Sequence, residues 1–219
     1  MADRRRETAR AAVKRYGRTY AEEAGIRLAD RPGPLYQLLV LATLLSTRIS
    51  TTIAVAAARQ LFAAGCRTPR AMREASWQDR VDALGRAHYR RYDERTATML
   101  GKGAELCLTR WHDDLRRLRR EAGRDERALR RLLIEFPGIG PTGADIFLRE
   151  AQAVWTDLAP YVDRKVVAGA QRLDLPASAA ELSGLVARDE VTRLASALVR
   201  VSIDRRAADE VRAEVAARR

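Results

Sequence analysis

The sequence contains few of the residues that stabilise small secreted proteins or anchor a chain in a membrane. Cysteine occurs only as Cys66 and Cys107, with no CxxC spacing, so the thiols can supply neither a disulfide framework nor a four-thiolate cluster site. No apolar run reaches the roughly 18 residues that a membrane-spanning helix needs. The Arg-rich N-terminus has no apolar signal core. We therefore expect a cytoplasmic protein with reduced thiols and no membrane contact.

Aromatic residues and lysines are also scarce. Aromatics make up 5% of the 219 residues and hydrophobic residues 47%, so a folded core must consist mainly of Leu, Val, Ile and Ala. Only Lys14, Lys102 and Lys165 carry a side-chain amine, which limits any chemistry that needs a lysine nucleophile. His88 and His112 are isolated from other ligand-type residues, so the sequence predicts no metal site.

Positive charge, in contrast, is abundant. Lysine and arginine number 41 against 29 acidic residues, which gives a formal net charge of +12 and a pI near 10.7. A surplus of this size favours a polyanionic partner, nucleic acid first. The alternative is a soluble protein that is basic without a polyanionic partner.

The spacing of apolar residues predicts an all-α fold. Apolar residues recur at helical intervals, and no segment alternates as a strand would. Thr68-Pro69 has the form of a helix start, and Gly85 is expected to end the helix that begins at Trp77. We expect residues 110–124 to be a solvated segment and 176–183 a linker or helix start. Helices are expected at 1–30, 35–45, 52–64, 70–75, 77–84, 89–108, 125–136, 142–151, 163–173 and from 190 onward.

The most specific segment is LLIEFPGIGPTGADIFLRE, which covers residues 132–150. Here an amphipathic helix ends, two glycines flank Ile139, and a second helix begins at once. Gly138 and Gly140 permit a tight turn and a close approach to a ligand, while Ile139 can fill the gap between the helices. The amides of this turn and of the next helix's first turn then form a site suited to a DNA phosphate. The alternative is an ordinary αα-hairpin with glycine caps.

This segment resembles the helix-hairpin-helix of the endonuclease III superfamily of DNA glycosylases, whose usual form is LPGVGxKTA. Three other segments, one of them residues 84–98, extend the resemblance to about residues 35–175. YVDRKV (161–166) resembles the VDTH-type segment that carries the family's catalytic aspartate, and residues 38–51 resemble the family's LLSAQ-type segment. The resemblance implies a two-lobed fold. Residues 35–151 would form a six-helix lobe with the hairpin at 126–151, and residues 1–34 and 152–219 a second lobe carrying Asp163.

The resemblance also implies roles for individual residues. Asp163 would stabilise the oxocarbenium-like cation formed when a base leaves deoxyribose, or would activate water. It equally suits the N-cap of the following helix. Arg48 would fill the space left by a flipped base, or contact a phosphate. Gly138, Ile139, Gly140, Thr142, Gly143 and Arg164 would contact DNA.

Three departures from the family pattern qualify these roles. Thr142 stands where bifunctional members carry the lysine that attacks the sugar, so we expect a monofunctional glycosylase with weak or no lyase activity; Thr142 also suits a helix N-cap. Lys165, beside the expected site, is the candidate for an atypical amine. The segment DRK replaces DTH, and the family's four-cysteine iron–sulfur loop is missing. The resemblance leaves room for a monovalent cation at the hairpin carbonyls, and no other cofactor is expected.

Three functions remain open at this point. The first is a monofunctional base-excision DNA glycosylase that acts on a damaged or mismatched base in double-stranded DNA. The second is a bifunctional glycosylase and lyase with an atypical amine. The third is a DNA-binding or lesion-sensing protein of the same fold without catalysis. In each case we expect a monomer in the cytoplasm, associated with the nucleoid if the source is bacterial.

Overall fold

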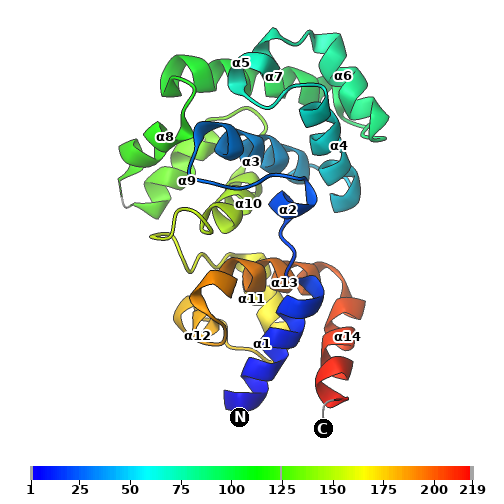
Figure 1. Cartoon of the computed structure of the whole chain (residues 1–219), viewed down its shortest axis with the longest axis vertical. Helices are drawn as coiled ribbons and strands as arrows, with labels where there is room; N and C mark the ends of the chain where they lie inside the picture. Colours follow the sequence, from blue (N-terminus) through cyan, green and yellow to red (C-terminus); the bar gives the residue numbers. More distant parts are fainter. Residues whose placement is uncertain (1, 124, 218–219) are drawn as a thin grey trace. The chain divides into compact units, whose positions relative to one another are not determined.

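The computed structural model describes residues 2–123 and 125–217, and within these ranges it contains helices and no strand (Figure 1). The all-α prediction is therefore confirmed. The chain divides into two compact units. We call Ala21–Phe147 the central unit, and the residues up to Tyr20 together with those from Leu148 onward the terminal unit. None of the described helices is long and apolar enough to cross a membrane.

The central unit is built around α3, whose nearly continuous apolar sequence is buried from Leu35 to Leu44. Figure 1 shows this helix running among the other helices of the unit. Because the other helices surround it, α3 can be apolar on every side. The helices of this unit are α2 (Tyr20–Glu23), α3 (Pro32–Leu45), α4 (Thr51–Ala63), α5 (Pro69–Glu74), α6 (Trp77–Arg86), α7 (Asp93–Trp111), α8 (Leu115–Ala122), α9 (Glu126–Ile134) and the first part of α10 (Pro141–Ala151).

The terminal unit is organised around α13, which contacts α1, α11 and α14. The side chains of Leu194, Leu198 and Val201 are buried. Gly169 on α11 lies so close to the Leu198 carbonyl that a methyl group there would overlap it. The helices are α1 (Ala2–Tyr16), the end of α10, α11 (Arg164–Arg172), α12 (Ala179–Ser183), the short 3-10 helix η1 (Arg188–Glu190), α13 (Val191–Ile203) and α14 (Arg205–Ala216).

Several predicted helices are wrong in extent. The helix expected over 1–30 ends at Tyr16, and α2 ends before Gly25, whose positive φ of 75° breaks the helical path. Gly85 lies inside α6 rather than ending it. The helix expected from Tyr89 begins only at Asp93, after its N-cap Tyr92, whose φ of −137° is not helical.

Two further predictions are wrong near the charged segments. Residues 110–124 contain α8, a short helix that buries Leu115, Leu118 and Ala122 while its arginines point outward. The helix expected from Glu190 onward is broken at Asp204, which has an extended backbone and caps α14 by accepting a hydrogen bond from the Arg206 amide at 2.9 Å. The many charged residues of 110–124 hid the apolar spacing of α8 in the sequence. The break at Asp204 is explained by its role as the N-cap of α14.

The boundaries of the units lie at 20/21 and 147/148, whereas the sequence placed them at 34/35 and 151/152. The stretch from α2 to Asp30 belongs to the central unit because its backbone and side chains bind there. Arg59 on α4 donates to the Glu23 carbonyl at 2.6 Å, and Arg119 on α8 pairs with Asp30 at 3.7 Å.

Candidate functional site

The hairpin between α9 and α10 has the form that the sequence predicted. Gly138 has a φ of 89°, and a Cβ atom there would lie 3.0 Å from the Thr43 Cγ2 atom, so the position requires glycine on two grounds. Ile139 is buried and lies against Gly143 at the start of α10. The side chain of Ile139 thus fills the space between the two helices, as expected.

The hairpin contains hydrogen-bond donors that the described chain leaves unused. The Ile139 amide donates to the Phe136 carbonyl at 2.9 Å, which closes the turn. No intramolecular partner is found within the described chain for the amides of Gly138, Gly140, Thr142 and Gly143. Because α10 begins at Pro141, the last two of these amides lie in its first turn, where the helix dipole also favours an anion. The turn can therefore bind a phosphate group.

Thr142 is exposed in the first turn of α10, one residue after the proline that begins the helix. The prediction that Thr142 caps the helix is therefore wrong, since a cap precedes the first helical residue. Its hydroxyl has no neighbouring base among its contacts in the described chain, so nothing in this unit activates it as a nucleophile.

Two side chains of the central unit hold the hairpin in place. Ser46, after the end of α3, lies 3.1 Å from the Gly138 carbonyl and 2.8 Å from the Thr43 carbonyl, so its hydroxyl proton is shared between them. Arg130 on α9 donates to both carboxylate oxygens of Asp145 on α10 and reaches the Pro141 carbonyl at 3.3 Å. The guanidinium group thus connects the two helices beside the unused amides.

Arg48 lies in the turn between α3 and α4, two residues after Ser46, and its side chain is exposed. The turn is anchored from within. The Thr47 hydroxyl lies 2.8 Å from the Tyr89 hydroxyl, which in turn lies 3.3 Å from the hydroxyl of Thr96. Arg48 and the hairpin therefore belong to one unit, and both are held by residues around the end of α3.

Asp163 is the N-cap of α11, which is one of the two roles that the sequence offered for it. Its Oδ1 atom accepts hydrogen bonds from the amides of Lys165 at 2.7 Å and Val166 at 3.0 Å. Its Oδ2 atom accepts a hydrogen bond from Arg149, near the end of α10. The side chain of Asp163 is 5% exposed and that of Arg149 is 2% exposed. Both carboxylate oxygens are thus occupied in a buried ion pair.

Arg149 is the residue that sequence reasoning missed. It lies in the apolar string IFLREA, where an arginine is normally assigned to an exposed helix face. The neighbouring Gln152 is also buried and connects α10 to the segment before Asp163. Its side-chain oxygen accepts from the Tyr161 amide at 2.9 Å, and its side-chain nitrogen donates to the Arg149 carbonyl at 2.8 Å.

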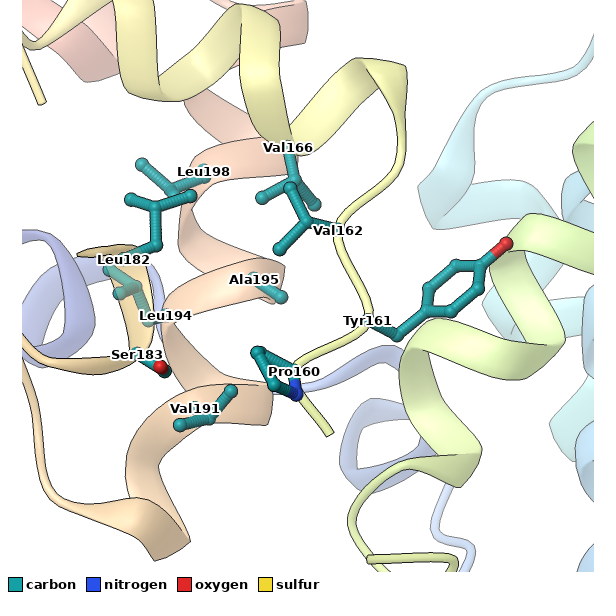
Figure 2. Close-up of a pocket in the computed structure, with 10 residues that line it drawn as sticks. All are labelled: Pro160, Tyr161, Val162, Val166, Leu182, Ser183, Val191, Leu194, Ala195 and Leu198. Atoms are coloured by element: carbon teal, nitrogen blue, oxygen red, sulfur yellow. The ribbon is translucent and has the colours of Figure 1, made fainter. Parts of the chain in front are cut away.

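The residues that follow Asp163 point elsewhere. Arg164 and Lys165 are exposed on the first turn of α11. Tyr161 is buried, and in Figure 2 its ring points away from the other labelled side chains.

The residues labelled in Figure 2 line a cavity next to this segment. Its volume is about 10 Å³, and its lining is mostly apolar. That volume is about the space of one water molecule, so the cavity cannot hold a nucleobase. Its walls are Pro160, Tyr161, Val162, Val166, Leu182, Ser183, Val191, Leu194, Ala195 and Leu198.

The two thiols are structural. Cys66 and Cys107 lie buried in the central unit. Burial raises the pKa of the Cys107 thiol to about 12 and also raises the pKa of Cys66, so both stay protonated and unreactive near neutral pH. Among the described residues, no three His, Cys, Asp or Glu side chains are grouped in a way that could hold a metal ion.

A comparison with solved structures finds one similar chain. It is a trapped endonuclease III–DNA covalent intermediate, an estranged-adenine complex. The similarity covers 89% of this chain and 84% of that chain, with 16% sequence identity and a TM-score of 0.48. No family model matches the chain, and no curated protein matches it.

Proposed function

We propose that this protein binds double-stranded DNA by holding a backbone phosphate at the hairpin between α9 and α10. The observation that carries the proposal is the group of four unused amides, at Gly138, Gly140, Thr142 and Gly143. Amides at a helix N-terminus favour an anion of this size. The net charge of +12 supports the same partner.

We further propose that the bound DNA undergoes monofunctional base excision. The bond between C1′ and the base nitrogen breaks, and its electron pair leaves with the base. Water then adds its hydroxyl to C1′, and the remaining proton goes to the base. Asp163 would stabilise the cationic sugar between these events. The lack of an amine at Thr142 supports hydrolysis over lyase chemistry, and Lys165 is the only lysine next to Asp163 in the sequence.

Supporting roles follow from exposure and charge. Arg48 would enter the space left by the flipped base, and Arg164 would contact a phosphate, since both side chains are exposed. A monovalent cation at the hairpin would use backbone carbonyls. The Gly138 carbonyl already accepts from Ser46, but a carbonyl oxygen has a second lone pair that a cation could use.

A second function is favoured by the geometry of Asp163 itself. Both of its oxygens already accept hydrogen bonds from groups of its own chain, so the carboxylate would have to exchange a partner before it could contact water or the sugar. This arrangement suits a protein that binds DNA or senses lesions without breaking a bond. Such a protein would bind duplex DNA in a strongly salt-dependent way and release no base.

One experiment separates the two functions. Duplexes carrying oxidised, alkylated, deaminated or mismatched bases are incubated with the wild type and with Asp163→Asn, and strand breaks are read with and without hot alkali. Breaks that need alkali and disappear in Asp163→Asn would establish monofunctional excision. A strong borohydride-trapped adduct with an abasic duplex would instead indicate a lyase, and its loss in Lys165→Ala would identify the amine. Duplex binding without breaks would establish the non-catalytic function.

The hairpin is tested separately by placing a negative charge among its amides. Thr142→Glu is expected to weaken duplex binding at least about 10-fold because the carboxylate repels the phosphate and competes for the same donors. Thr109→Glu is the matched control, since Thr109 is also an exposed helical threonine of the central unit. Equal affinities for the two variants would contradict phosphate binding at the hairpin.

A further inference from the structure

Arg149 is buried to an extent that is unusual for an arginine. Its side chain is 2% exposed, and its Nε atom has no hydrogen-bond partner within the described chain. A buried guanidinium is strongly unfavourable unless a negative charge compensates for it. In this protein the compensating group is the carboxylate of Asp163.

The pair fixes the orientation of the Asp163 carboxylate. The two helix amides of α11 hold the Oδ1 atom, and Arg149 holds the Oδ2 atom. An N-cap aspartate held only through Oδ1 could still turn its second oxygen toward other partners. Because Arg149 occupies that oxygen, the plane of the carboxylate is set by groups on two different helices.

The backbone around the pair is held by a second contact between the same two segments. Gln152 bonds the Arg149 carbonyl and the Tyr161 amide, at 2.8 Å and 2.9 Å. Gln152 is 2% exposed, so solvent does not compete for these bonds. The distance between Arg149 and Asp163 is therefore fixed by the backbone as well as by the ion pair.

We propose that Arg149 is the positioning residue for Asp163, and this inference rests on the base-excision function proposed above. Arg149 contributes to the rate by holding the Asp163 carboxylate in one orientation before the base departs. The known cost of misplacing a catalytic group by about 1 Å is up to about 100-fold in rate. Arginine is suited to this role because its planar fork fixes a direction, whereas lysine offers a single point charge.

The test compares Arg149→Met and Arg149→Lys with the wild type on the duplex that the lesion panel identifies. Single-turnover base release and the Kd for the duplex are measured separately. We expect Arg149→Met to lower the release rate about 100-fold with the Kd changed less than about 3-fold. The release rate of Arg149→Lys is expected to lie between these two, about 10-fold below that of the wild type. Lysine keeps the positive charge but lacks the planar group that fixes the direction of the hydrogen bonds.

The matched control is Arg200→Met, which removes another arginine of the terminal unit. Arg200 lies over the Tyr20 ring at 4.4 Å and donates to the Arg18 carbonyl at 2.9 Å, away from Asp163. A merely structural loss would lower stability in both variants and would leave the release rate of the folded fraction unchanged. Release by Arg149→Met within about 3-fold of the wild type would overturn the inference. If Arg149→Met does not fold, an unchanged rate in Arg149→Lys would overturn it.

The same experiment distinguishes failure of the inference from failure of the proposed function. If the wild type releases no base from any duplex, excision itself is wrong, and the positioning role falls with it. If the wild type is active and Asp163→Asn is inactive while Arg149→Met keeps its rate, only the positioning role is wrong.

Discussion

Two ion pairs on α10 differ in how far water reaches them. Arg130 and Asp145 in the central unit have side chains 32% and 22% exposed, whereas Arg149 and Asp163 in the terminal unit are 2% and 5% exposed. Water can solvate either member of the first pair if the other is removed. Water cannot solvate either member of the second pair in this way, because both side chains are buried. Loss of one partner should therefore cost little stability in the Arg130–Asp145 pair and much more in the Arg149–Asp163 pair.

The two candidate sites differ in the same way. The hairpin leaves four amides unused, so it is incomplete without a ligand. The Asp163 carboxylate has both oxygens occupied by groups of its own chain. Phosphate binding therefore needs only groups that the chain leaves unused. Base excision, in contrast, requires a carboxylate whose two oxygens are already hydrogen-bonded.

The largest expected effect is on the buried pair. Arg149→Met leaves the Asp163 carboxylate buried without its partner and should lower the free energy of unfolding by about 3–5 kcal/mol. Urea denaturation followed by circular dichroism measures this. The double variant Arg149→Met/Asp163→Asn, which removes both charges, should recover a large part of the loss. A loss below about 1 kcal/mol in Arg149→Met would show that water reaches the pair and would remove the contrast with Arg130.

The next effect concerns the hairpin glycine. Gly138→Ala places a side chain at a φ of 89° and 3.0 Å from Thr43, so we expect a loss of about 1–3 kcal/mol and weaker duplex binding. Gly140→Ala is the control, because nothing lies within 4 Å of a Cβ atom at that position. Thermal denaturation and duplex titration of both variants give the comparison. Equal stabilities would mean that the turn relaxes around the methyl group.

A smaller effect is expected for the half-exposed pair. Arg130→Met should cost about 1 kcal/mol or less and weaken duplex binding a few-fold, because the Pro141 carbonyl and α10 lose a support. The slope of log affinity against log salt should not change, since a residue paired with Asp145 is not neutralising a phosphate. A fall in slope of about 0.9 would instead show a direct phosphate contact. Asp145→Asn should have a similar effect, and the two should not add.

The smallest effect is an alkaline loss of stability in the central unit, where both thiols lie. The pKa of Cys107 is raised to about 12 in the folded state, against about 8.5 in an unfolded chain. Because the folded value is the higher one, the thiol's contribution is complete below the unfolded value and is lost as the pH rises above it. We expect a loss of about 0.7 kcal/mol between pH 8 and pH 9. In Cys107→Ala this share of the pH dependence should disappear in urea titrations at the two pH values.

Local sequence patterns predicted the hairpin and the cap of α11 because neighbouring residues determine both. Gly138 needs a positive φ whatever surrounds it, and an aspartate before a helix accepts from the amides of that helix in most settings. The same local patterns predicted the helix start at Thr68, whose side chain accepts from the Ala71 amide at 3.2 Å.

The features that sequence reasoning missed depend on residues far apart in the chain. Nothing near Arg149 indicates that it is buried, because its partner lies fourteen residues away across a turn. In residues 110–124 the many charged residues suggested a solvated segment. The apolar spacing of Leu115, Leu118 and Ala122 is recognised as helical only because the structure shows these side chains buried. The residues from Ala21 to Asp30 belong to the central unit, and their contacts with α4 and α8 cannot be recognised from any local sequence pattern.

The arrangement of the terminal unit has a consequence for the order in which the two units can fold during synthesis. Lys14 and Arg15 on α1 form ion pairs with Glu214 on α14, at 3.1 Å and 3.5 Å, across 200 positions of sequence. The whole central unit is one continuous stretch between these partners. On the ribosome, the central unit can complete its core while α1 still lacks α13 and α14. Helix α1 is thus made well before the helices it packs against, and its apolar face, with Ala9 and Ala12, lacks these partners until α13 and α14 have been synthesised.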